Sequence, residues 1–175
     1  FPNLARDIYH LNEDSIARLV AMGRLPAMLM LFLMSPVIDR LNLVRFYGIA
    51  LFTDGLLLAA IALSPGTILA SGAYLLFYLS HGLVWAFALP AINVCVRPRL
   101  RDSAFALTAM FEITGVFSAG LLHNRMLERG AGLPSVFIVC GIIVGVSGLL
   151  LLAYSFSRHA RFNGQKDGTG KDAGP

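Results

Sequence analysis

Three ionisable residues lie deep inside long apolar stretches of this 175-residue chain: Arg24, Asp54 and Glu112. A charge at the centre of a lipid bilayer costs at least about 2.5–3.5 kcal/mol, so an ionisable residue there is by default a candidate for function. At about 1.5 Å per helical residue, Arg24 and Asp54 lie at similar depths, on the order of 12–14 Å from the same side. Two alternatives remain open: a structural ion pair between Arg24 and Asp54, or an Arg24 that faces a cavity and binds an anionic substrate group.

Glu112 has no obvious partner in the sequence and lies on the order of 13–14 Å deep in its own stretch. Burial in a low dielectric favours the neutral form of a carboxyl group, which can then take up and release a proton near physiological pH. We expect Glu112 to act as a group that takes up and releases a proton. The alternatives are a protonated acid that hydrogen-bonds a neighbouring helix, or a pair with Arg24.

A stripe of aromatic and polar rings follows a third apolar stretch: Tyr74, Tyr78, His81 and Trp85. Their spacings of four, three and four residues place all of them on one helical face. A lipid-facing stripe would favour aliphatic side chains, whereas these rings carry polar groups. We expect this face of four residues to line a wet cavity, with ordinary helix packing and an interfacial Tyr74 as the alternative.

Long apolar stretches dominate the chain and position these residues. Hydrophobic residues make up 57% of the sequence, charged residues 14%, and the mean hydropathy is +0.71, whereas a soluble domain carries about 25% charged residues. A membrane-spanning helix needs about 20 mostly apolar residues. The sequence therefore predicts an all-α membrane protein, a transmembrane bundle over residues 16–157, with five helices at about 16–38, 44–63, 67–96, 103–122 and 136–156.

The basic residues predict the orientation of the chain, since basic loops stay in the cytoplasm. Residues 158–175 are rich in Gly, Lys and Asp, and we expect them to form a disordered cytoplasmic tail in a protein of the cell (inner) membrane. Nine basic residues fall on one side and three on the other: Arg40, Arg45, Arg97, Arg99, Arg101, Arg158, Arg161, Lys166 and Lys171, against Arg6, Arg125 and Arg129.

Small residues at helical spacing indicate where helices pack closely. The last stretch contains Gly141 and Gly145 four residues apart, with Gly148 one turn further, and the first contains Gly23 and Ala27. Such spacing lets two helix backbones approach each other. We expect packing within the chain, and a dimerisation face is the alternative for Gly141 and Gly145.

We expect neither the chemistry of a membrane enzyme nor a metal site. Cys95 and Cys140 both lie within apolar runs, which excludes a disulfide scaffold and a cysteine-based zinc site. The sequence contains neither HExxH nor GxSxG, and it has no glycine-rich phosphate loop. We therefore predict no enzyme activity, no metal, no cofactor and no nucleic-acid partner.

Two loops carry a resemblance to a known family. Residues 35–45 resemble the G-x-x-x-D-R-x-G-R-R loop of the major facilitator superfamily through Asp39, Arg40 and Arg45, although Ser35 and Asn42 stand in place of glycines and Leu43 in place of a basic residue. The basic segment 97–107 is similar to the loop that opens the eleventh helix of that family. The resemblance covers nearly the whole chain, up to about residue 162.

The resemblance implies the C-terminal half of such a transporter. The five spans would be helices eight to twelve of a six-helix half-bundle, and residues 1–15 would hold an outer loop and the end of a sixth helix. Asp39, Arg40 and Arg45 would form the cytoplasmic gating loop. Two halves would then rock around a site near the membrane midplane, and the N-terminal half would be missing from a chain that is a fragment.

The sequence thus predicts a secondary active transporter that moves a small solute by alternating access, coupled to protons. Its candidate substrate or coupling residues are Arg24, Tyr78, His81, Trp85 and Glu112. The alternative is a non-transporting membrane scaffold or assembly factor on the same fold. The identity of the substrate is left open.

Overall fold

The structure is a computed structural model that describes residues 2–38 and 41–156. The gating-loop residues Asp39 and Arg40 and the tail 158–175 lie outside the described residues. Within the helices, a few side chains also lie outside the description: those of Pro2, Leu31, Ser35, Val37, Val94, Phe111, Glu112, Val116 and Ala119.

Helices make up almost all of the described chain, and these residues contain no strand. Five helices have the length and composition of membrane spans, which confirms the predicted all-α class and the predicted number of spans. The fourth span differs most, because α5 continues past residue 122 to Glu128. The elements are α1 (Pro2–Asp7), α2 (Glu13–Ile38), α3 (Leu43–Leu63), α4 (Thr67–Cys95), the short 3₁₀ helix η1 (Pro98–Leu100), α5 (Arg101–Glu128) and α6 (Leu133–Phe156).

Local signals set several of the helix ends. The side-chain Oδ1 of Asn12 accepts a hydrogen bond from the Ser15 backbone N–H at 2.8 Å, and Oδ1 of Asn42 accepts one from the Arg45 N–H at 3.2 Å. Each asparagine thereby satisfies a backbone donor that the first turn of a helix leaves unpaired. Gly130 follows α5 with a φ of 77°, a left-handed conformation that favours glycine and ends the helix.

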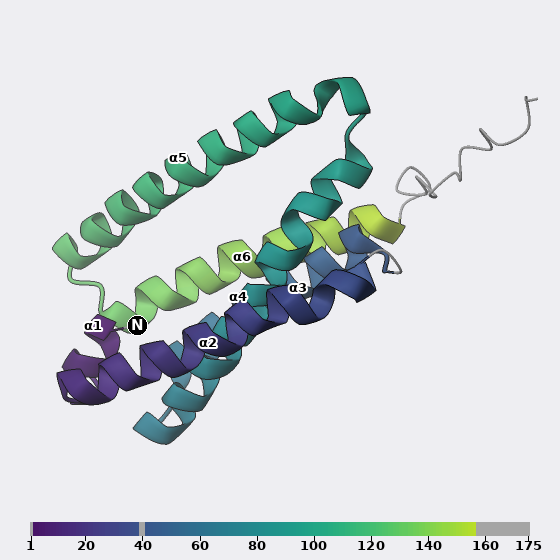
Figure 1. The fold of residues 1–175 in the computed structure, drawn as a ribbon. Helices are drawn as coiled ribbons and strands as arrows, with labels where there is room; N and C mark the ends of the chain where they lie inside the picture. The colour runs from purple at the N-terminus through teal and green to yellow at the C-terminus, as the bar shows by residue number, and fades with distance from the viewer. Residues whose placement is uncertain (1, 39–40, 157–175) are drawn as a thin grey trace, which may run out of the picture.

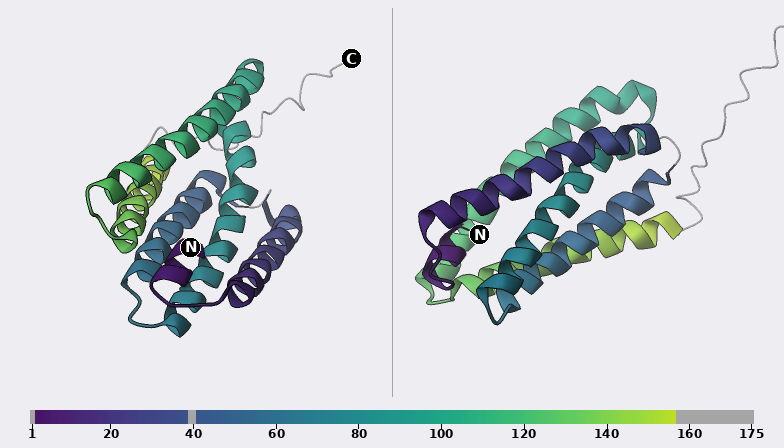
Figure 2. Two further views of the ribbon diagram at one scale, coloured as in Figure 1. Left: turned by 90° about the vertical axis from the view of Figure 1, so that its left-hand side faces the viewer. Right: turned by 60° about the horizontal axis from the view of Figure 1, so that its bottom comes forward.

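Four of the spans form a row in the order α2, α4, α3, α6. α2 packs on α4, α4 on α3, and α3 on α6, so α4 lies between two helices that are consecutive in the sequence (Figures 1 and 2). α5 runs apart from this row over most of its length (Figure 1). None of its described side chains is buried.

Glycines hold α3 and α6 together at very short range. A Cβ atom built on Gly55 of α3 would come within 2.5 Å of the Gly141 carbonyl oxygen and of the Gly145 nitrogen. The predicted glycine pair of α6 therefore packs inside the chain, against α3. Between α2 and α4 the contact is similar, because a Cβ on Gly82 would meet Ala27 Cα at 2.9 Å.

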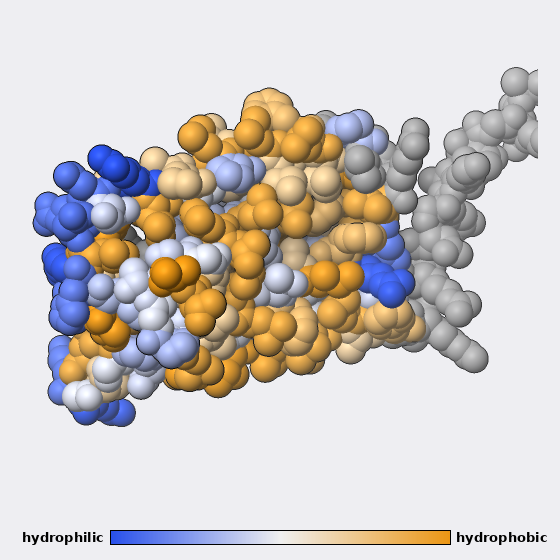
Figure 3. Space-filling model, turned by 90° about the horizontal axis from the view of Figure 1, so that it is seen from below, coloured by the Kyte–Doolittle hydropathy of each residue, from blue (hydrophilic) through white to orange (hydrophobic). Residues whose placement is uncertain are grey.

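The surface of the molecule has an apolar band between two polar ends. Figure 3 shows hydrophobic side chains over the middle of the helices and hydrophilic ones at the ends. Large apolar side chains face outward in this band, for example Phe32, which is 76% exposed, and Ile113, which is 72% exposed. Exposing this much apolar surface to water is unfavourable, whereas the hydrocarbon core of a bilayer can cover it.

Candidate functional site

A buried carboxylate and an imidazole meet halfway along two neighbouring helices. Asp54 is the twelfth of the 21 residues of α3, and its side chain is 3% exposed. Its Oδ2 atom lies 2.9 Å from Nδ1 of His81. His81 is the central residue of the 29-residue α4, and its side chain is 43% exposed. The pair is therefore closed on the Asp54 side and open on the His81 side.

Trp85 fixes which imidazole nitrogen carries the hydrogen when His81 is neutral. The Trp85 Nε1–H donates to Nε2 of His81 at 3.1 Å, one helical turn further along α4. An indole nitrogen can only donate, so Nε2 must be the acceptor and Nδ1 must hold the hydrogen. The Nδ1–H of His81 then donates to the Asp54 carboxylate. The three side chains form a hydrogen-bonded chain in the order Trp85, His81, Asp54.

The second carboxylate oxygen of Asp54 lacks such a contact. Oδ1 is buried and has no hydrogen-bond partner among the described residues. Leaving a buried polar atom unsatisfied costs about 1–3 kcal/mol, and more for a charged group. Among the described residues, one hydrogen bond, from His81, therefore reaches the buried Asp54 carboxyl group.

The partner of Asp54 differs from the one that the sequence suggested. Asp54 pairs with His81 and not with Arg24. The suggested pair assumed that α2 and α3 are direct neighbours because they follow each other in the chain. α4 packs between them instead, and His81 of α4 forms the hydrogen bond to Asp54.

Arg24 lines a cavity of about 420 Å³ at the junction of α2, α3, α4 and α6. Arg24 is the one charged residue of the eight that line it. Two tyrosines of α4, Tyr74 and Tyr78, share the wall, and their rings meet edge to face with centroids 4.9 Å apart. The eight lining residues are Val20, Arg24, Leu58, Ile61, Tyr74, Phe77, Tyr78 and Phe137.

The cavity adjoins the buried pair through one aromatic contact. Phe77 lines the cavity and stacks on the His81 ring, with centroids 5.4 Å apart and the ring planes 19° from parallel. Gly23 of α2 allows Tyr78 to lie close to the helix backbone, since a Cβ there would come within 3.1 Å of Tyr78 Cγ. The structure thus brings Arg24, Tyr78, His81 and Trp85 into one region at the middle of the spans.

Tyr74 packs inside the protein, near the start of α4. Tyr74 is 3% exposed and packs with Leu4 of α1 and Ile61 of α3 in a buried cluster.

Phe77 was not among the sequence candidates. It precedes His81 by four residues, one helical turn, and that spacing could have identified it as a neighbour.

The other predicted residues are separate from this region. The backbone of Glu112 lies in α5, and its side chain is outside the described ones. In the predicted gating loop, Arg45 is described, and its guanidinium carbon lies 4.9 Å from the centroid of the Phe156 ring. This cation–π contact joins the start of α3 to the end of α6.

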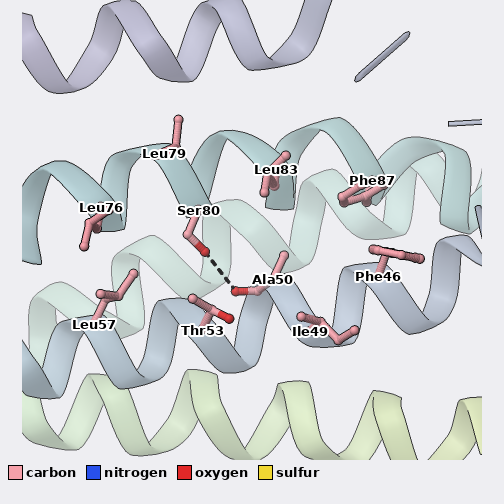
Figure 4. A pocket seen from close by; sticks show the side chains of 10 residues that line it. All are labelled: Phe46, Ile49, Ala50, Thr53, Leu57, Leu76, Leu79, Ser80, Leu83 and Phe87. Atoms are coloured by element: carbon pink, nitrogen blue, oxygen red, sulfur yellow. Dashed lines mark hydrogen bonds between the residues drawn. The ribbon is translucent and has the colours of Figure 1, made fainter. Parts of the chain in front are cut away.

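A second hollow, of about 300 Å³, lies between α3 and α4 on a different face of α4 (Figure 4). None of its ten lining residues is charged. The hydroxyl of Ser80 points across it and donates to the Ala50 carbonyl oxygen at 3.3 Å. This apolar hollow offers no group that could hold a charged solute, so the candidate site is the cavity beside Arg24 with the neighbouring pair.

No family model, no curated protein and no solved structure matches this chain. Its function is therefore argued from the geometry of this site.

Proposed function

We propose that this chain belongs to a secondary active transporter of the major facilitator type, which moves a small solute by alternating access and couples that movement to protons. The observation that carries the proposal is the Asp54–His81 pair, which lies at the midpoints of two spans with one carboxylate oxygen unpaired. The cavity beside Arg24 supplies room for a solute next to it.

A structural role alone is a poor explanation for the pair. Replacing a buried ion pair by well-packed apolar residues is often neutral or stabilising, so packing does not require these two residues. Ionisable residues inside a membrane commonly form proton relays. Histidine in particular changes its charge near neutral pH when its environment does not perturb it.

The hydrogen bonds define how a proton would be taken up. Nε2 of His81 has its lone pair occupied by the Trp85 N–H. A proton from the open side can bind Nε2 only when Trp85 swings away, because the imidazolium would then present two donors. The net charge of the Asp54–His81 pair changes from −1 to 0 in this step. Proton uptake is thereby tied to a movement of Trp85 and to the removal of a buried charge.

A second helical bundle completes the proposed transporter. α5 presents no buried side chain among those described, although it carries exposed hydroxyls at Thr114 and Ser118. None of the described residues covers the open side of His81 or the half-exposed Trp85. In the proposal, the N-terminal half of the same protein covers these surfaces within the bilayer, with the basic C-terminal end of this chain in the cytoplasm.

Trp85 allows a direct test of the proton site, because its indole donates directly to His81. The fluorescence that Trp85 contributes, measured in lipid nanodiscs as the difference between the wild type and Trp85→Phe, should change reversibly with pH. Asp54→Asn and His81→Gln should abolish that titration, whereas the control His123→Gln in α5 should preserve it. A titration that survives His81→Gln would refute the proposed proton site.

The transport step is tested with the full protein in liposomes that contain a pH-sensitive dye. Small neutral, anionic and cationic solutes are added outside in turn. At least one class should evoke a proton flux in the wild type that Asp54→Asn abolishes. The absence of any evoked flux, with the Trp85 titration intact, would favour a non-transporting scaffold instead.

A further inference from the structure

We infer that the cavity beside Arg24 binds an organic anion with a flat apolar body, such as an aromatic carboxylate. The inference rests on the proposed function, because it names the class of solute that the transporter would move. Four kinds of observation carry it: the charge of the cavity, its rings, its size and its contact with the proton pair.

The charge of the cavity is positive. Arg24 is the twelfth of the 26 residues of α2, and it is exposed in the cavity. Among the described residues, no Asp or Glu oxygen forms an ion pair with it. The Asp54 carboxylate is engaged by His81. A guanidinium at this depth needs an anion or water, and its planar fork matches a carboxylate or a phosphate in particular.

The rest of the wall suits a flat apolar body. Phe77, Tyr78 and Phe137 present rings, and Val20, Leu58 and Ile61 present aliphatic side chains. The volume of about 420 Å³ is near the lower end of the usual range for small-molecule sites, which is about 300–1,000 Å³. A small anion with one ring therefore fits better than a large amphiphile.

The same cavity connects the solute to the proton. Phe77 separates a ligand at Arg24 from the His81 ring on which it stacks. A bound anion would stabilise the positively charged imidazolium, and by thermodynamic reciprocity a proton on His81 would strengthen anion binding. Among the described side chains, the charged and titratable groups around His81 are Arg24 on α2, Asp54 on α3 and the two tyrosines of α4, and α6 contributes the neutral Phe137. Anion and proton should therefore bind together and move in the same direction.

The test uses three fluorinated probes of similar size and different charge: para-fluorobenzoate, para-fluorobenzamide and para-fluorobenzylammonium. Their binding to the full protein in nanodiscs is measured by fluorine NMR. The benzoate should bind about tenfold more tightly than the other two, as expected for a charge-assisted bidentate contact. Its binding should be tighter at mildly acidic than at mildly alkaline pH. It should also move the midpoint of the Trp85 titration to higher pH.

Substitutions at two positions of α2 provide the matched comparison. Arg24→Gln should weaken benzoate binding by about tenfold, and Arg24→Lys should restore part of it. Arg18→Gln removes the same charge from the same helix outside the cavity and should leave binding unchanged. Leu58→Phe, which fills the cavity, should weaken all three probes that bind there.

Each failure has its own meaning. Equal or tighter binding of the amide or the ammonium probe would overturn the anion assignment, as would unchanged benzoate binding in an Arg24→Gln protein that keeps its Trp85 titration. In both cases the proposed proton site would stand. Arg24-dependent benzoate binding in a protein whose Trp85 does not titrate would support the anion site and refute the proposed coupling.

Discussion

Asp54 and His81 meet at 2.9 Å between Oδ2 and Nδ1, and each lies at the middle of its own membrane-spanning helix. Trp85 occupies the opposite nitrogen of the same imidazole. Both nitrogens of His81 are thus engaged, one by an acceptor and one by a donor. The ring can gain a proton only by giving up a hydrogen bond.

Removing His81 alone should destabilise the protein more than removing both members of the pair. His81→Leu leaves the buried Asp54 carboxyl group without its hydrogen bond, which should cost about 1–3 kcal/mol. The double variant with Asp54→Leu removes the carboxyl group as well and should recover most of that loss. Thermal denaturation in detergent measures both, and equal losses in the single and double variants would contradict the prediction.

Alanine should be far worse at Gly55 than at Gly145. A Cβ on Gly55 would lie 2.5 Å from two backbone atoms of α6, which cannot move aside, whereas a Cβ on Gly145 would meet its nearest neighbour, Gly55 Cα, at 3.9 Å. Overpacking of this kind costs about 1–3 kcal/mol, so Gly55→Ala should lower the melting temperature. Gly145→Ala should leave it nearly unchanged, and Gly115→Ala, with open space around it, is a second control.

Tyr9→Phe should loosen the contact between the α1–α2 loop and the end of α3. The Tyr9 hydroxyl donates to the carbonyl oxygens of Ile61 and Ser64 at 3.0 and 3.1 Å. Those carbonyls lie where the helix ladder ends, so the substitution should cost about 1 kcal/mol. Faster amide hydrogen exchange at the α3–α4 loop would confirm it, and unchanged exchange there would refute it.

The same contact should make stability fall at alkaline pH. Burial raises the pKa of the Tyr9 phenol above its ordinary value of 10.0, so the folded chain holds this proton more tightly than the unfolded chain. The contribution is complete below pH 10.0 and disappears as the pH rises through the folded-state pKa. Alkaline melting curves of the wild type should therefore converge on those of Tyr9→Phe, while the two remain separate at neutral pH.

Arg45→Gln should weaken the contact between the start of α3 and the end of α6. The guanidinium lies over the Phe156 ring at 4.9 Å, an exposed arrangement that contributes about 0.5–1 kcal/mol. Phe156→Leu should have a similar effect, and combining the two substitutions should add little. A double-mutant cycle by thermal denaturation measures this, and fully additive losses would refute the contact.

The sequence predicted the spans because apolar length alone determines them. It also predicted that Gly141 and Gly145 would lie against another helix. Hydropathy does not indicate which helices are neighbours, so the position of α4 between α2 and α3 could not be obtained from it. The partner of Asp54 was missed for this reason, although His81 lies at the same relative depth in its helix. The coupling role of Glu112 and the gating role of Asp39 and Arg40 stay predictions.

The position of α4 has a mechanical consequence. The same helix carries His81 toward α3 and Tyr78 toward α2. Any rigid tilt of α4 would change the geometry of the Asp54–His81 pair and the shape of the cavity beside Arg24 at the same time. States that hold only the proton or only the solute would then be rare. Movement of one across the membrane without the other would require α4 to bend.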